Sequence, residues 1–541
     1  MKITYNGNKS IPSRELNQAI LSRIKGEYSE SILNQDVERI IRAYYNKGFF
    51  SPTVKTKTRE ISNGIEIIFD IKEGPRPKIK EIRIEDDQKD YPKDLLRLKL
   101  GDFFIQEGIR ESQKKIENFY KEKGYAFAEA SFSIIPDSGI LAFSVKKGDK
   151  FYIKDILISG LRSTNPMVVQ REIEFKKGDI YSEKKLFNSR RRIYSLGFYS
   201  MVNVELLKET TDSLSLIFTI RELKTRVLNF GTGISFPLGF LLSLGLEELN
   251  LFNRGHRLKI EPSFKINTKR EWEAKFEVHY LYPYLTPFKL NASIIPFYWY
   301  ENQEEFAKST RGFELRLSKI YSENIQANIG NKYRYVNYQP KLALSDTVEG
   351  VTNSIRLQLM LDYRDEFFNP KKGLYSSLLT EYAGGILGGA NNFLRLEDEI
   401  RLYLEPFERI ILAGRLKLGS LIPTDGVSID EKYFVGGQYT LRGYEEKSLG
   451  PDSIGDDHYG NYLVNLNSEV RIALVKNLGM VIFLDAAGVN NRIDFKEKNH
   501  LGMSAGLGLR YNTPLGPIRV DLGIPLWEKG YGIYLGLYHI F

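Results

Sequence analysis

The chain has 541 residues, which is more than one hydrophobic core supports and predicts about three or four units of domain size. It contains no cysteine, so disulfides, thiolate metal sites and cysteine nucleophiles are excluded. No apolar run approaches the ~18 to 20 residues of a membrane helix, so a membrane-spanning form would have to be a closed barrel. The net charge of +9 is modest, and the basic run Arg190 to Arg192 favours a solvated helix face over a nucleic-acid partner.

Three N-terminal segments repeat one pattern, in which a helical stretch ends at an aromatic-glycine turn. Gly48, Gly124 and Gly197 occupy the equivalent turns, and in each segment a short strand comes before the helical stretch and two strands follow the turn. The predicted order is β-α-α-β-β, with repeats over 1–75, 76–149 and 150–224. Such a small sheet leaves an edge strand that can accept an extended peptide, although a generic α+β repeat without a peptide role fits the pattern as well.

After about residue 225 the helical pattern stops and sixteen candidate strands follow. The predicted fold is therefore a set of α+β repeats followed by a 16-stranded antiparallel transmembrane β-barrel over 225–541. A soluble sandwich would also alternate apolar and polar residues, as Ser354 to Tyr363 does, but many strands here exceed the ~5 to 6 residues usual in soluble sheets. They match the ~9 to 11 that cross a bilayer, and an even strand number suits a bacterial barrel. The last strand is predicted over 531–541, and a long sixth outer loop over 421–457.

The sixth loop contains the stretch YFVGGQYTLRGYEEKSLG, residues 433–450. Gly436 frees the backbone, and Gly443 lets the chain turn sharply between Arg442 and Tyr444. An arginine on such a turn presents a planar fork of donors that pairs best with a carboxylate. The alternative is an ordinary solvated surface loop, because such loops are usually polar and rich in glycine.

The repeats resemble POTRA domains, the periplasmic modules of outer-membrane assembly proteins, and the whole chain resembles the BamA/TamA-type outer-membrane insertases. Four residues match the sixth-loop motif of that superfamily: Leu441, Arg442, Gly443 and Tyr444. Residues 481–489 resemble its strand-thirteen motif, which implies that Asp485 is the inner-wall partner of Arg442. Ala487 departs from the motif, because a glycine is common there. Residues 361–375 and 511–526 also match, and three repeats favour the TamA branch.

The resemblance implies an outer-membrane protein assembly factor in the bacterial outer membrane, with its repeats in the periplasm. Its partners would be unfolded outer-membrane or secreted polypeptides, the lipid bilayer, and a possible periplasmic or inner-membrane protein, and it would need neither cofactor nor nucleotide hydrolysis. Export requires a signal peptide, and the start MKITYNGNKS has no apolar segment of that kind.

The resemblance also implies lateral opening at a seam between the first and last barrel strands, and glycine weakens strand pairing there. The expected seam residues are Asn229, Gly231, Gly233, Gly532, Tyr534 and Gly536. In the last strand, Leu535, Leu537 and Phe541 are expected on one face, as in the terminal signal of barrel substrates.

Three other functions fit parts of the sequence. A two-partner polypeptide secretion pore resembles the chain but usually has two POTRA repeats and an N-terminal plug helix, and a diffusion porin would need no repeats. Gly502 to Gly506 spells the G-x-S-x-G of a nucleophile elbow, but the predicted strand continues through it, so no elbow can form and no enzyme activity is expected. The five histidines lack metal-ligand spacing, so no metal site is predicted.

Overall fold

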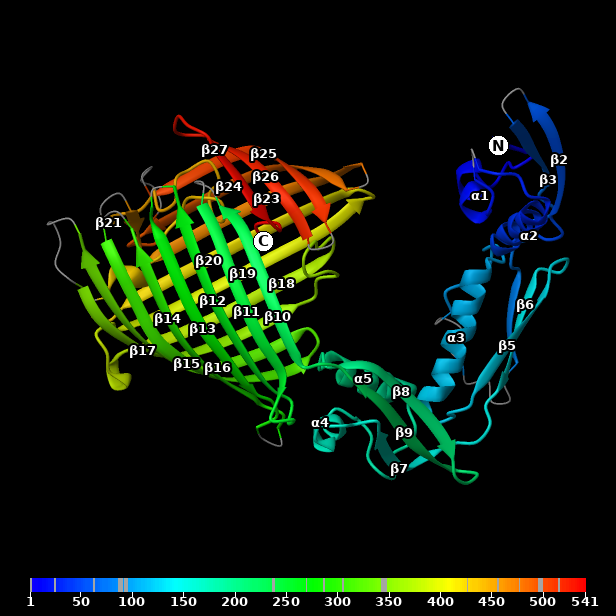
Figure 1. Ribbon diagram of the computed structural model, residues 1–541, viewed down its shortest axis with the longest axis horizontal. Coiled ribbons are helices and arrows are strands. Elements are labelled where there is room, and N and C mark those ends of the chain that lie inside the picture. Colours follow the sequence, from blue (N-terminus) through cyan, green and yellow to red (C-terminus); the bar gives the residue numbers. More distant parts are fainter. Residues whose placement is uncertain are drawn as a thin grey trace. The chain divides into compact units, whose positions relative to one another are not determined.

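The computed structural model describes residues 2–23, 26–61, 64–85, 91, 96–235, 239–268, 270–285, 288–303, 306–341, 348–425, 427–454, 457–475, 477–494, 500–513 and 516–541. The chain divides into two compact units, Met1–Glu222 and Leu223–Phe541. The first unit contains three small sheets with their helices, and the second contains one large sheet (Figure 1). Within the described ranges, no helix is both long and apolar enough to cross a membrane.

Each repeat folds around a three-stranded sheet whose central strand comes last in the chain. The elements are β1 (Lys2–Asn6), α1 (Ser13–Ala19), α2 (Glu30–Asn46), β2 (Thr53–Ile61) and β3 (Gly64–Lys72) in the first repeat; β4 (Glu81–Glu85), α3 (Gln106–Glu122), β5 (Glu129–Ile135) and β6 (Ile140–Lys146) in the second; and β7 (Tyr152–Ser159), α4 (Pro166–Gln170), α5 (Glu183–Ser195), β8 (Tyr199–Lys208) and β9 (Ser213–Glu222) in the third. The strand orders are β1-β3-β2, β4-β6-β5 and β7-β9-β8. The predicted β-α-α-β-β order is confirmed in the first and third repeats. In the second, residues 86–90 and 92–95, where the first helix is expected, lie outside the described residues.

The aromatic-glycine turns end the long helices of the repeats. Gly48 has a φ of 86°, and the amide of Phe49 donates a hydrogen bond to the carbonyl of Tyr44 at 3.1 Å, as in a glycine C-cap. Gly124 and Gly197 adopt the same left-handed conformation, with φ of 102° and 84°. Residues other than glycine rarely adopt this backbone conformation, which explains why a glycine recurs at these three positions.

The second unit is a sheet of sixteen antiparallel strands in which every neighbour in sequence is a neighbour in space. The strands are β10 (Arg226–Ser235), β11 (Gly239–Leu251), β12 (His256–Asn267), β13 (Trp272–Tyr282), β14 (Asn291–Asn302), β15 (Phe306–Ser322), β16 (Ile325–Pro340), β17 (Val348–Asp362), β18 (Gly373–Ala383), β19 (Phe393–Phe407), β20 (Ile410–Pro423), β23 (Tyr462–Val475), β24 (Leu478–Asn490), β25 (Leu501–Thr513), β26 (Gly516–Pro525) and β27 (Gly532–Leu537). The predicted sixteen-stranded antiparallel fold is therefore confirmed.

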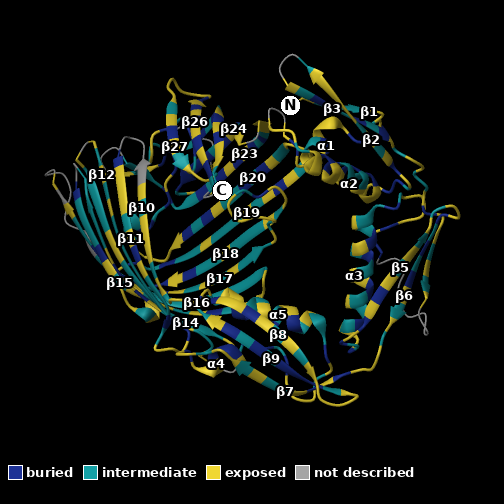
Figure 2. Cartoon of the chain, turned by 45° about the vertical axis from the view of Figure 1, so that its right-hand side comes forward, coloured by how far each residue is buried: buried dark blue, intermediate teal, exposed yellow. Residues whose placement is uncertain are grey.

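Exposure alternates along these strands, and the more exposed face is the apolar one (Figure 2). On β17, Ile355 and Leu357 are 41% and 50% exposed, whereas Thr352 and Ser354 are buried. A soluble sheet places its apolar face inside, so the inverted pattern indicates an outer surface that faces hydrocarbon and a polar interior.

The first and last strands, β10 and β27, come close to each other, but no hydrogen-bonded ladder joins them within the described residues. The barrel expected from the sequence is thus not closed by hydrogen bonds between its first and last strands within the described residues. We call the boundary between β10 and β27 the seam.

The prediction that the last strand runs to residue 541 is wrong. β27 ends at Leu537, Tyr538 adopts a left-handed φ of 64°, and its amide donates to the carbonyl of Pro517 at 2.7 Å. The ladder with β26 ends where Leu537 lies opposite Ile518, and the left-handed backbone at Tyr538 ends the strand there. Phe541 is instead buried against Tyr403, and it does not share the exposed face of Leu535 and Leu537.

Candidate functional site

The sixth loop, predicted over 421–457, lies between β20 and β23 at residues 424–461, because β20 extends to Pro423 and β23 begins at Tyr462. It folds back on itself at two glycines. It also contains the short strands β21 (Asp452–Ile454) and β22 (Asp457–Tyr459). Gly436 has a φ of 113°, and a Cβ there would collide with the carbonyl of Glu445. Gly443 has a φ of 102°, and a Cβ there would lie 3.0 Å from the main chain of Gly523. Both positions therefore require glycine, for conformation and for close packing.

The loop is packed against the barrel wall and is not a solvated surface loop. Val435, Leu441 and Tyr444 are buried in one apolar cluster with Ala487 and Val489 of β24. The strand-thirteen position where a glycine is common thus accommodates the methyl group of Ala487, which is fully buried. This cluster fixes the turn that carries Arg442.

Arg442 is fully buried and forms a bidentate pair with Asp485. Its Nε donates to Oδ2 at 2.7 Å and its Nη2 donates to Oδ1 at 2.9 Å. Its Nη1 donates to Glu469 of β23 at 2.9 Å and to Asp521 of β26 at 3.3 Å, and its guanidinium lies 3.4 Å from the ring centre of Phe483. We call Arg442 with these three carboxylates the Arg442 latch. It joins the loop to three strands.

The resemblance pointed to Asp485 but not to Glu469 or Asp521. A signal for both was present, because polar residues alternate along Asn465, Asn467 and Glu469 in β23 and again along Arg519 and Asp521 in β26. Each of the two carboxylates also pairs with arginines other than Arg442. The further pairs are Arg471 with Glu469 at 2.8 Å, Arg510 with Asp521 at 2.5 Å, and Arg519 with Asp521 at 2.7 Å.

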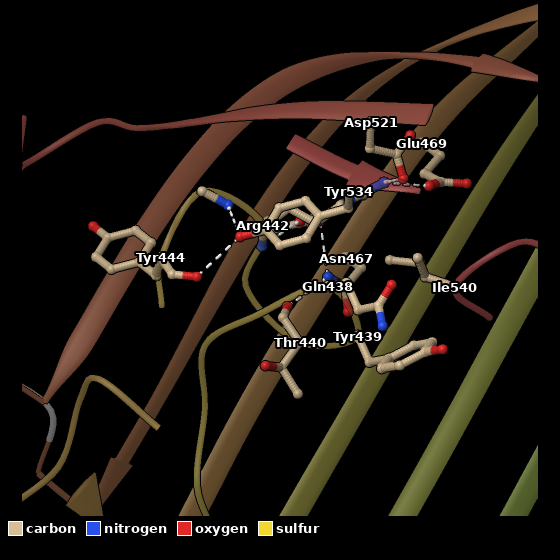
Figure 3. Close-up of polar contacts among 12 residues, drawn as sticks. Gln438, Tyr439, Thr440, Arg442, Tyr444, Asn467, Glu469, Asp521, Tyr534 and Ile540 are labelled. Carbon is tan, nitrogen blue, oxygen red and sulfur yellow. Dashed lines mark hydrogen bonds and ion pairs between the residues drawn. The ribbon is translucent and has the colours of Figure 1, made fainter. Parts of the chain in front are cut away.

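The turn that carries Arg442 also contacts the last barrel strand. The amide of Gly443 donates to the Tyr534 hydroxyl at 3.0 Å, and that hydroxyl donates to the carbonyl of Tyr444 at 3.0 Å. Figure 3 shows Tyr534 beside Arg442 and Tyr444. A Cβ at Gly532 would collide with the Tyr534 hydroxyl, and a Cβ at Gly536 would lie 2.9 Å from Nε of Arg519. The glycines of β27 thus give room to side chains that bind the loop.

The structure brings most of the sequence-predicted residues together, but not all. Asn229, Gly231 and Gly233 lie in β10 and pair with β11, and no described hydrogen bond joins them to β27. Gly502 to Gly506 lies inside the continuous strand β25, so the nucleophile elbow is not formed. Among the residues that the structure describes, no group of histidine, aspartate and glutamate could hold a metal ion.

Sixteen antiparallel strands that follow three α+β repeats define a barrel protein with N-terminal repeat domains. The chain belongs to the Omp85 superfamily. The Omp85 superfamily domain matches residues 250–537, and the surface antigen variable number repeat, POTRA, matches residues 1–74, 77–148 and 151–223.

Relatives and solved structures agree with this assignment. The outer membrane protein assembly factor BamA of Nitratidesulfovibrio vulgaris is 25% identical over 565 residues, which cover 97% of this chain and 70% of that protein. That of Neisseria meningitidis is 22% identical, with 97% of this chain and 76% of that protein covered.

Two solved structures share the fold. The crystal structure of BamA from Haemophilus ducreyi lacking POTRA domains 1–3 matches 85% of this chain and 99% of that chain, with a TM-score of 0.67 and 19% identity. CdiB from Acinetobacter baumannii matches 95% of this chain and 100% of that chain, with a TM-score of 0.52 and 15% identity.

Proposed function

We propose that the chain is an outer-membrane protein assembly factor that receives unfolded outer-membrane or secreted polypeptides on its repeats and templates their strands at the seam. The observation that carries the proposal is the open seam. β27 is only six residues long, and no ladder ties it to β10 within the described residues.

The physical reason is the cost of unpaired backbone in hydrocarbon. Each unsatisfied amide or carbonyl costs several kcal/mol there, so a nascent strand needs a partner edge before it can enter the bilayer. The edges of β10 and β27 offer such a partner, because they lie in a barrel with an apolar outer surface. This step needs no nucleophile, cofactor or nucleotide.

The repeats supply edges of a second kind. In each three-stranded sheet the first strand and the penultimate strand are the edges, and an extended peptide can add to an edge. In the third repeat the edge of β7 is already bonded at Ile153, to Gly178 and Asp179. We propose that the repeats lie in the periplasm, where they meet unfolded substrates. The number of repeats favours the TamA branch, whereas the relatives reported above are BamA factors.

The function can be tested with the full chain in lipid vesicles and a urea-denatured barrel protein as substrate. Appearance of folded substrate is followed by its gel mobility without heating. We expect the initial rate to rise at least tenfold over vesicles that carry boiled protein. An unchanged rate would contradict the proposal.

The second candidate, a two-partner secretion pore, has the fold of CdiB in its favour. A pore needs an open lumen, whereas here Val435, Leu441 and Tyr444 of the sixth loop and Phe541 are buried inside the barrel unit. Transport of a polypeptide into the vesicle interior, without its insertion, would favour the pore.

A further inference from the structure

The sixth loop has a tight turn eleven residues before Arg442, at the 3-10 helix η3 (Ile429–Glu431). The amide of Glu431 donates to the carbonyl of Ser428 at 3.0 Å. The amide of Ser428 donates in turn to Oδ1 of Asn391 at 2.7 Å, which fixes the turn to the loop between β18 and β19. The Glu431 side chain is only 4% exposed, so the turn places a carboxylate against the barrel wall.

This carboxylate is bound by three strands that take no part in the Arg442 latch. Oε1 accepts a hydrogen bond from the Thr352 hydroxyl of β17 at 2.6 Å and another from Arg334 of β16. Oε2 accepts from Nη2 of Arg395, on β19, at 3.1 Å, and the same Nη2 donates to the main-chain carbonyl of Glu431 at 2.6 Å. The other terminal nitrogen of Arg395, Nη1, donates to Glu381 at 3.2 Å, so the planar fork holds Glu431 and Glu381 in one orientation.

The wall at this point has an excess of positive charge. A cavity of about 30 Å³ beside Glu431 is lined by Lys332, Arg334, Arg356 and Arg395, and the carboxylates that face it are Glu381 and Glu431. Burial would raise the pKa of Glu431, but Arg334 and Arg395 hold that pKa at about 2, so the carboxylate is ionised at neutral pH. Without it, Arg334 would keep, among the described residues, only Asp430, at 3.8 Å. Arg395 would keep Glu381, at 3.2 Å, and Glu397, at 3.9 Å. Loss of the nearest carboxylate from a buried group of cations destabilises the structure.

The segment between Glu431 and Arg442 is packed along its length. Tyr433 forms a β-bridge with Gly460, and Val435 forms one with Leu449. If only Arg442 were bound to the barrel wall, the segment could rotate about that contact. Because Glu431 is bound as well, both ends of the segment are fixed to the wall.

We propose that Glu431 is a second anchor of the sixth loop, a positioning residue that fixes the loop to β16, β17 and β19. Together with the Arg442 latch on β23, β24 and β26, it ties two separate arcs of the barrel through one loop. The anchor sets the position of the loop, and only its effect on insertion rests on the function proposed above.

The position of the loop can be read with a cysteine at Ser448, because the chain has no native thiol. The Ser448 hydroxyl is buried and has no hydrogen-bond partner within the described residues, so S448C is a nearly isosteric probe. The full chain in lipid vesicles is treated with a maleimide, and the labelling rate is compared for S448C alone, S448C with E431Q, and S448C with E446Q. Glu446 is an exposed carboxylate of the same loop and serves as the matched control.

We expect E431Q to raise the labelling rate of the S448C thiol at least tenfold and E446Q to leave it unchanged. The folded barrel should be retained in E431Q, as shown by gel mobility without heating. If E431Q does not fold, Arg395→Lys replaces it. Lysine keeps the charge but has one nitrogen in place of the two that bind Glu431 and Glu381, so labelling should again rise, by less than tenfold.

A folded E431Q, or a folded R395K in its place, that is labelled as slowly as the parent would overturn the proposal, and so would equal acceleration by E446Q. Insertion of a barrel substrate is measured on the same vesicles. Faster labelling with an unchanged insertion rate would support the anchor and count only against the link between loop position and insertion.

Discussion

The contacts of Arg442 allow a specific prediction of how much Arg442→Ala destabilises the barrel. In Arg442→Ala, Glu469 keeps Arg471 and Asp521 keeps Arg510 and Arg519. Asp485 keeps two neutral donors, the Asn467 side-chain amide at 2.8 Å and the backbone amide of residue 442 at 3.3 Å. The substitution therefore leaves a fully buried carboxylate without its cation, and we expect unfolding of the barrel to become easier by about 3–5 kcal/mol.

Asp485→Ala should lower the free energy of unfolding by less than Arg442→Ala does. Asp485→Ala leaves Arg442 bound to Glu469 and Asp521, so we expect a loss of about 1–3 kcal/mol. The double variant should be no less stable than Arg442→Ala alone, because the charge that the single substitution leaves unpaired has been removed as well.

The measurement is urea unfolding in lipid vesicles, followed by tryptophan fluorescence. The three tryptophans, at positions 272, 299 and 527, all lie in the barrel unit, so the signal reports this unit. Arg316→Ala is the matched control, because Arg316 pairs with Glu314 at 2.6 Å but is 38% exposed, and its loss should cost no more than about 1 kcal/mol. Strictly additive losses for Arg442 and Asp485, or losses no larger than that of the control, would refute the reasoning.

Two further predictions concern the last strand and the repeats. Tyr534→Phe removes the hydroxyl that joins β27 to the sixth loop, a loss of about 1 kcal/mol, so the β27 amides should exchange roughly fivefold faster while those of β19 do not change; equal exchange would mean that the hydroxyl does not hold the strand. In the third repeat, burial raises the pKa of Glu222. Hydrogen bonds from Ser163 and Thr164 lower it by more, so the pKa lies below its usual value. A lowered carboxyl pKa stabilises the fold above the unfolded-state pKa, and this contribution is lost as pH falls through the folded-state pKa. Glu222→Gln should therefore lower the melting temperature of the helical circular dichroism signal at neutral pH and leave it unchanged in acid, and an equal effect at both pH values would contradict the assignment.

Local patterns were sufficient for most of the fold. Helical spacing before Gly48, Gly124 and Gly197 located the repeats, and strict alternation located the barrel strands. Both signals depend only on near neighbours in sequence, which is why they can be read without a structure. The pairing of Arg442 with Asp485, in contrast, came from the resemblance to a known motif, because no spacing rule brings two residues so far apart in sequence together.

The remaining features depend on distant parts of the chain. The alternation of Ile533, Leu535 and Leu537 continues the strand pattern, but β27 stops opposite Ile518 of β26, where Tyr538 turns and donates to the carbonyl of Pro517. Glu431 looks like any acidic loop residue until Arg334 and Arg395 are placed beside it. The end of β27 and the binding of Glu431 both depend on which strands lie next to them in the fold. Residues near them in sequence do not carry this information.

The most direct test of the central claim is a disulfide across the seam. Tyr534 binds the sixth loop, so the cysteines belong on exposed neighbours: Leu228 or Phe230 on β10, and Ile533 or Leu535 on β27. The Cα atoms must lie within about 7 Å, so the four pairs are scanned to find the register. The account predicts that the locked protein stays folded and binds substrate through its repeats, that insertion of the substrate stops, and that reduction restores it. Insertion at the full rate by a protein with a locked seam would contradict the account.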